Sequence, residues 1–122
     1  MTETRHVDEE LDILKSRLMA MGALAEQRMC AAVDALVAAD RETLRQVRGG
    51  DQALNDLQME IDDRCFRLLA LQHPVAVDLR FIVTTTKVTV DLERIGDQAV
   101  NIAEAADRYL DHRPVKPLID LP

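Results

Sequence analysis

The chain has 122 residues, a length that one domain can fill with a hydrophobic core of its own. Its formal net charge of -7 repels the phosphates of a nucleic acid, which argues against nucleic-acid binding. Aromatic residues make up 2% of the sequence, so the core must consist mainly of Leu, Ile, Val, Met and Ala, a composition that favours helices.

The first residues of the chain and its cysteines indicate in which cellular compartment the protein is expected. Residues 1–12 are acidic and polar rather than an apolar signal region, and no stretch approaches the roughly 18 to 20 uncharged residues of a membrane span. We therefore expect a cytoplasmic protein without membrane insertion. Cys30 and Cys65 lack the short spacing of zinc sites and fall at helical core spacing, so both are predicted to be reduced core residues.

A long amphipathic helix is predicted first. From Leu11 onward, apolar residues recur in steps of three and four, which is the period of a helix packed on one side. Acidic residues occupy its first turn, where carboxylates suit the positive end of the helix dipole. The acidic residues are Asp8, Glu9 and Glu10, and the apolar stripe is Leu11, Leu14, Leu18, Met21, Ala25, Met29, Ala32 and Leu36.

Two capping signals divide the middle of the chain. Asp40 can cap a short helical piece near residues 41–48, and Gly49-Gly50 then ends that piece. Asp51 is placed to begin a second long helix, which we expect to run to about Gln72. One face of it carries Leu54, Leu57, Ile61, Cys65 and Leu68.

A third long helix is predicted from near Pro74 to near His112, because proline fits the first turn of a helix but not its interior. Its expected packing seam is Val88, Leu92, Ile95, Ala99, Ile102, Ala106 and Tyr109. Residues 113–122 contain three prolines and are predicted to form an extended arm or linker. The domain prediction is thus one helical repeat over residues 1–112 followed by this arm.

Short connections between long amphipathic helices make neighbours pack antiparallel. The predicted fold class is all-α, an antiparallel three-helix bundle with a short helical piece between the first and second long helices.

Oxygen-bearing side chains line both later helices. Glu93, Asp97 and Asn101 are four residues apart on the third helix, and Asp51, Asn55 and Asp62 form a comparable ladder on the second. Two such ladders on adjacent helices could hold a metal ion. Spacing alone favours the alternative, a solvated acidic face or an ion-pair network around Arg94. A second acidic face of the middle helix carries Asp56, Glu60 and Asp63.

Three stretches together resemble the PhoU family of phosphate-signalling proteins: residues 69–80 (LALQHPVAVDLR), 91–97 (DLERIGD) and 101–104 (NIAE). The resemblance covers nearly the whole chain. It implies a three-helix repeat that occurs twice in the family and once here, so the chain is either an N-terminal half or a single-repeat member.

Members of this family bind multinuclear iron or zinc clusters through paired Glu/Asp-x-x-x-Asp motifs on adjacent helices. The resemblance assigns Glu93 and Asp97 to one motif, and Asp51 with Asn55 to its partner, in which an amide replaces the second acid. It further implies a regulator without catalytic activity, which contacts the phosphate ABC transporter and the membrane sensor kinase and dampens signalling when phosphate is plentiful.

Two alternatives remain open. One is a metal-free structural or oligomerisation bundle, and the other is a metal-dependent hydrolase that uses the same carboxylates around a bound water. The hydrolase is the least favoured, because the sequence offers no general base near a pocket. We also expect a homodimer, because a single repeat without its covalent neighbour would leave an apolar face exposed.

Overall fold

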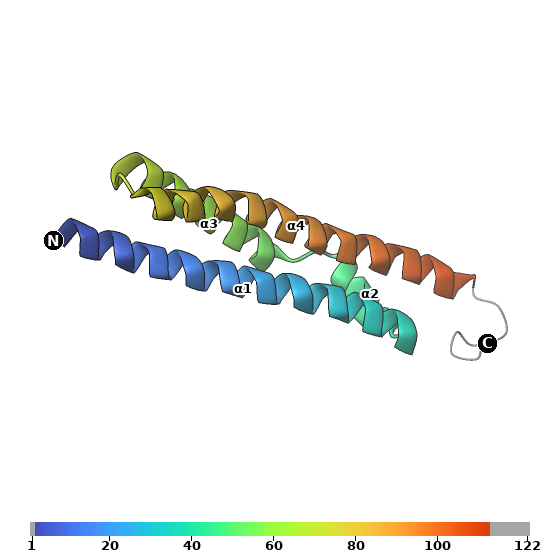
Figure 1. Ribbon diagram of the computed structural model, residues 1–122. Coiled ribbons are helices and arrows are strands. Elements are labelled where there is room, and N and C mark those ends of the chain that lie inside the picture. Colours follow the sequence, from blue (N-terminus) through green and yellow to red (C-terminus); the bar gives the residue numbers. More distant parts are fainter. Residues whose placement is uncertain (1, 113–122) are drawn as a thin grey trace. The chain divides into compact units, whose positions relative to one another are not determined.

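The computed structural model describes the backbone of residues 2–112 and the side chains of residues 5–112. Its elements are four helices, α1 (Thr2–Ala38), α2 (Arg41–Arg48), α3 (Gln52–Leu71) and α4 (Ala76–Asp111), and Figure 1 shows their order along the chain. The all-α prediction is confirmed, including the short α2 between the first two long helices. The predicted arm over residues 113–122 lies outside the described residues.

One helix start differs from its prediction and another agrees with it. α1 begins at Thr2, several residues before the predicted first turn, because polar helix formers extend a helix beyond the stripe that packs. α4 begins at Ala76, two residues after Pro74, so its predicted start near that proline is confirmed. His73, just before that proline, has a left-handed φ of 45°. It lies in the turn that leads out of α3.

The chain divides into two compact units. One unit, called here the α3 unit, contains α3 together with α1 up to Leu24 and α4 up to Glu93. The other, called the α2 unit, contains α2 together with the remainder of α1 and of α4. In the described part of the chain, no helix has an apolar stretch that could cross a membrane.

In the α3 unit, consecutive long helices run antiparallel. Arg17 of α1 pairs with Glu60 of α3, and Glu10 pairs with Arg64, so residue numbers fall along one helix as they rise along the other. The Thr89 hydroxyl of α4 donates to the Asp62 carboxylate of α3 at 3.3 Å. The buried apolar side chains of this unit are Leu11, Leu14, Met21, Leu54, Ile61, Cys65, Leu68 and Ile82.

In the α2 unit, the short helix supplies the large side chains of the core. Leu44 and Val47 of α2 are buried against a lining of small residues. These are Ala32 and Ala35 of α1 with Ala99, Ala103 and Ala106 of α4. Alanines leave room between the two long helices, and α2 fills that room with a leucine and a valine.

The predicted seam of α4 is correct at Ala99 and Ala106, which are buried, but its larger residues are not the deepest ones. The innermost positions are Ile82, Thr85 and Thr89 in the α3 unit, and Gly96, Ala99, Ala103 and Ala106 in the α2 unit. The larger Val88, Leu92 and Ile102 are half-buried, and Ile95 is 38% exposed. Small side chains occupy the deepest positions. The Thr85 hydroxyl donates to the Phe81 carbonyl at 2.9 Å, and the Thr89 hydroxyl shares its one hydrogen between the Thr86 carbonyl at 2.9 Å and the Asp62 carboxylate.

The two cysteines have different surroundings. Cys65 is buried, as predicted, and its burial, followed by the charge of Asp62, raises the pKa of its thiol to about 11. Cys30 is exposed, so the prediction that it belongs to the core is wrong. It follows Met29 on α1 and lies beyond the edge of the packed stripe.

We therefore predict two rates of thiol modification at pH 8. Cys30 reacts rapidly with Ellman's reagent in the folded protein, whereas Cys65 reacts only after unfolding, since about one thiol in a thousand is ionised at that pKa. Cys30→Ser removes the fast phase and leaves the slow one. Equal rates for both thiols in the folded protein would contradict the assignment.

Candidate functional site

The connection from α1 to α3 begins at the cap of α2. The Asp40 carboxylate accepts a hydrogen bond from the Thr43 backbone N–H at 3.2 Å and another from the Thr43 hydroxyl at 2.7 Å. The predicted capping role of Asp40 is confirmed. These two hydrogen bonds hold the pKa of the Asp40 carboxyl below its ordinary value of 3.8. The bond from the Thr43 hydroxyl has the larger effect, and the bond from the Thr43 backbone N–H comes second.

Arginines of α2 pair with carboxylates of α4. Arg48 lies 2.7 Å from Asp107 Oδ2, and Arg41 lies 2.6 Å from Asp111 Oδ1. Arg41 is also 3.9 Å from Asp107 Oδ1, a buried oxygen without a hydrogen-bond partner among the described residues. Asp107 is mostly buried, and two guanidinium groups compensate its charge.

The end of α2 is held by a residue of α1. Arg28 Nη2 donates to the carbonyls of Val47 at 2.8 Å and of Gly50 at 2.9 Å, with a longer contact to Gln46 O at 3.5 Å. Gly50 has a φ of 80°, a left-handed conformation that glycine adopts without strain. The Arg28 Nε atom also lies 3.9 Å from the Asp51 carboxylate. Arg28 thus secures both the last turn of α2 and the start of the chain toward α3.

The four predicted metal ligands are divided between the units. Asp51 and Asp97 belong to the α2 unit, whereas Asn55 and Glu93 belong to the α3 unit. Asp51 and Glu93 are half-buried, and Asn55 and Asp97 are exposed. Among residues 5–112, no three or more His, Cys, Asp and Glu side chains gather closely enough to hold a metal ion. The ligand set stays a prediction.

Chemically, the four side chains offer oxygen donors, which suit a hard or borderline cation. Glu93 and Asp97 lie one turn apart on α4, as their spacing predicted. The Arg28 guanidinium beside Asp51 acts against a metal, because it supplies the positive charge that a cation would otherwise bring.

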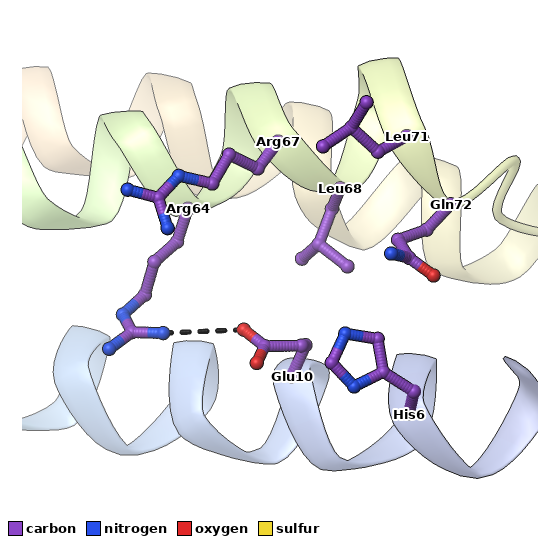
Figure 2. Close-up of a pocket in the computed structure, with 7 residues that line it drawn as sticks. All are labelled: His6, Glu10, Arg64, Arg67, Leu68, Leu71 and Gln72. Carbon is purple, nitrogen blue, oxygen red and sulfur yellow. Dashed lines mark hydrogen bonds and ion pairs between the residues drawn. The ribbon is translucent and has the colours of Figure 1, made fainter. Parts of the chain in front are cut away.

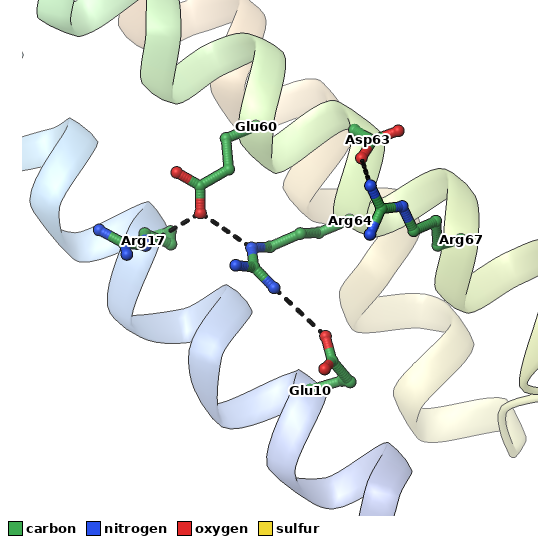
Figure 3. A network of polar contacts seen from close by, with 6 residues as sticks. All are labelled: Glu10, Arg17, Glu60, Asp63, Arg64 and Arg67. Carbon is green, nitrogen blue, oxygen red and sulfur yellow. Dashed lines mark hydrogen bonds and ion pairs between the residues drawn. The ribbon is translucent and has the colours of Figure 1, made fainter.

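The second acidic face of α3 is an ion-pair network. Figure 3 shows a chain of ion pairs along this face. The Glu60 carboxylate pairs with Arg17 at 3.0 Å and with Arg64 at 2.9 Å, and Arg64 also pairs with Glu10 at 3.3 Å. Asp63 pairs with Arg67 one turn along α3, at 2.6 Å. Asp56 of the same face accepts a hydrogen bond from Gln52 at 2.9 Å.

The fold and these motifs can be compared with known proteins. The PhoU domain family matches residues 18–106, most of the described chain. The chain belongs to the PhoU family. A solved structure named as the crystal structure of PhoU from Pseudomonas aeruginosa aligns with a TM-score of 0.82 and 40% identity, covering 87% of this chain and 51% of that one.

Curated relatives of this PhoU-family chain carry one shared name, phosphate-specific transport system accessory protein PhoU or its homolog. The Pseudomonas putida protein is 43% identical over 107 residues, covering 84% of this chain and 42% of that protein. The Aquifex aeolicus protein is 36% identical over 113 residues, covering 93% of this chain and 51% of that protein. The chain therefore spans about half the length of the relatives it matches. A single repeat over residues 1–112 stays a prediction.

The cap of α2 gives a pH-dependent prediction. Because the pKa of Asp40 is lowered on folding, its stabilising contribution is complete above its ordinary value of 3.8 and is lost as the pH falls through the folded value. Asp40→Ala should lower the urea midpoint of unfolding at pH 6, and the difference from wild type should narrow below pH 3.8. The exposed Asp34→Ala is the matched control. A difference that is constant with pH would contradict the capping account.

Proposed function

We propose that this protein is an accessory regulator of phosphate uptake and of the phosphate-starvation response, and that it has no catalytic activity of its own. The observation that carries the proposal is the family match over residues 18–106, joined to relatives named as accessory proteins of the phosphate-specific transport system. The relatives that carry this name are about twice as long as this chain, so the accessory role is an inference for this chain.

The proposed mode of action is protein contact in the cytoplasm, with the phosphate ABC transporter and the membrane sensor kinase as partners. Large apolar side chains on the surface of the α3 unit support a contact role, since exposed apolar groups are suited to interfaces. Phe66, Leu71, Val75 and Val77 are each at least 67% exposed. The same kind of surface supports the proposed homodimer.

A reporter of the phosphate-starvation response tests this function. Deletion of the gene for this protein should leave the reporter active in plentiful phosphate, and expression of the protein should restore repression. Phe66→Ser with Val77→Ser should weaken repression without unfolding the protein, because both side chains are mostly exposed. A deletion that leaves the reporter fully repressed would contradict the proposal.

We further propose a carboxylate metal site for iron or zinc, formed by Glu93, Asp97, Asp51 and Asn55. The match of Glu93 and Asp97 to the family's acidic motif supports it, together with their one-turn spacing on a single helix. Asn55 contributes a neutral oxygen, so the site would hold less negative charge than four carboxylates. Binding would also require the Asp51 carboxylate to exchange its contact with Arg28 for the metal.

Elemental analysis of the purified protein tests the metal site. Stoichiometric iron or zinc is expected in the wild type and should be lost in the double variant Glu93→Gln, Asp97→Asn. Asp34→Asn with Asp63→Asn removes the same charge from exposed carboxylates and should retain the metal. If none of the three proteins holds metal and all are equally folded, the metal-free bundle is correct. Phosphatase activity with added metal would instead support the hydrolase.

A further inference from the structure

A strip of exposed apolar side chains runs along the α3 unit, where α3 and α4 lie next to each other. The Thr89 hydroxyl of α4 contacts the Asp62 carboxylate of α3, and the two helices run antiparallel, so the residues that follow Asp62 lie beside those that precede Thr89. Steps of three and four keep the strip on this one side of each helix. It is called here the α3/α4 strip and consists of Phe66, Leu69, Leu79, Val83 and Val90, which are between 38% and 69% exposed.

The other sides of the two helices face α1. Figure 2 shows a pocket of about 250 Å³ between α1 and α3, to which α1 contributes Glu10 and α3 contributes Arg64 and Leu68. On α4, the centre of the Phe81 ring lies 5.6 Å from Lys15 Nζ of α1. The α3/α4 strip lies away from these contacts, so its apolar side chains are open to a partner.

The two helices bring opposite charges to this strip. Asp62, four residues before Phe66, is exposed, and the hydroxyl that it contacts on α4 is neutral. Lys87, four residues after Val83, is exposed, and its ammonium group has no ion pair within residues 5–112. Arg80, three residues before Val83, is exposed in the same way. The α3 side of the strip is therefore negative and the α4 side positive.

A second copy of the chain matches this arrangement, whereas a partner with charge of one sign would be repelled by one of the two helices. A two-fold axis along the helices places α3 of each copy against α4 of the other, and Asp62 of each copy then lies close to Lys87 of the other. An axis across the helices would instead place α3 against α3 and bring like charges together. Asp63 and Arg67 do not alter this balance, because they pair with each other on α3 at 2.6 Å.

We propose that two copies of this chain associate through the α3/α4 strip, with α3 of each copy against α4 of the other. The inference rests on the homodimer of the proposed function, and it adds the face that pairs and the direction in which the copies lie. The apolar side chains form the centre of the contact, and the pairs between Asp62 and Lys87 set its register. None of these residues belongs to the proposed metal site, so the contact does not require a metal.

Sedimentation equilibrium in the presence of EDTA tests the face. The dissociation constant of the wild-type dimer should rise about tenfold in Phe66→Ser, because a large apolar side chain is lost from the centre of the contact. Val77→Ser is the matched control, since Val77 is 76% exposed in the same unit and lies four residues before Phe81, on the side of α4 that faces α1. This variant should form dimers as strongly as wild type does.

Charge reversal tests the direction of the two copies. Lys87→Glu and Asp62→Lys should each weaken the dimer about tenfold, because each places like charges in both symmetry-related contacts. An equal mixture of the two variants should dimerise as wild type does, since the mixed dimer restores opposite charges in both contacts. Lys15→Glu reverses an exposed lysine of α1 and should leave the dimer unchanged. Circular dichroism checks that each variant is folded.

The outcomes separate this inference from the proposals on which it rests. A wild-type monomer at high micromolar concentration would overturn both the homodimer and its face. Undiminished dimers in Phe66→Ser, or a mixture that dimerises no better than either charge variant alone, would overturn the face and leave the homodimer standing. The regulatory function is tested separately, because the response of the reporter to gene deletion does not depend on which face pairs.

Discussion

The side chain of Arg28 holds the end of α2 in place. The last carbonyls of a helix have no partner within it. Arg28 donates from a neighbouring helix to one of them, that of Val47, and also to the carbonyl of Gly50 in the turn that follows α2. Its side chain is 18% exposed, so these charged hydrogen bonds are shielded from water and stronger than neutral ones. The turn through Gly49 and Gly50, and with it the position of Asp51, depends on this contact.

The two units use charge in different ways. In the α3 unit, Arg17, Glu60, Arg64 and Glu10 form a continuous chain that joins α1 to α3. In the α2 unit, arginines of α2 pair with carboxylates of α4 beside a core made largely of alanine. Much of the acidic character of the chain is thus matched by arginines. The excess of carboxylates is therefore weak support for a metal, and the family motif at Glu93 and Asp97 is the stronger argument.

Local signals predicted most of the fold. The long helices, the Asp40 cap, the end of α2 at the glycines and the buried face of α3 all follow from helical period and capping chemistry, which need few residues to operate. The deepest positions of α4 were not all predictable in this way, because they went to Thr85, Thr89 and Ala103 rather than to larger residues. Cys30 was misplaced for a similar reason, since spacing does not mark the edge of a packed face.

The candidate site was harder to predict. The role of Arg28 depends on contacts 19 and 22 residues away along the chain, and a single sequence contains no signal for such pairs. The pocket around Arg64 and Leu68 likewise requires His6 and Glu10 from another helix. What the sequence did indicate was the acidic motif, whose spacing is local to α4.

Native-state hydrogen exchange on Arg28→Gln tests the central claim most directly. The free energy of opening for the amides of α2 should fall by about 1.5–3 kcal/mol, the worth of hydrogen bonds to a charged group. Arg17→Gln removes an arginine whose side chain is 48% exposed, and should change those amides by less than about 1 kcal/mol. Unchanged protection of α2 in Arg28→Gln would contradict the claim that this arginine holds the helix and the turn to Asp51.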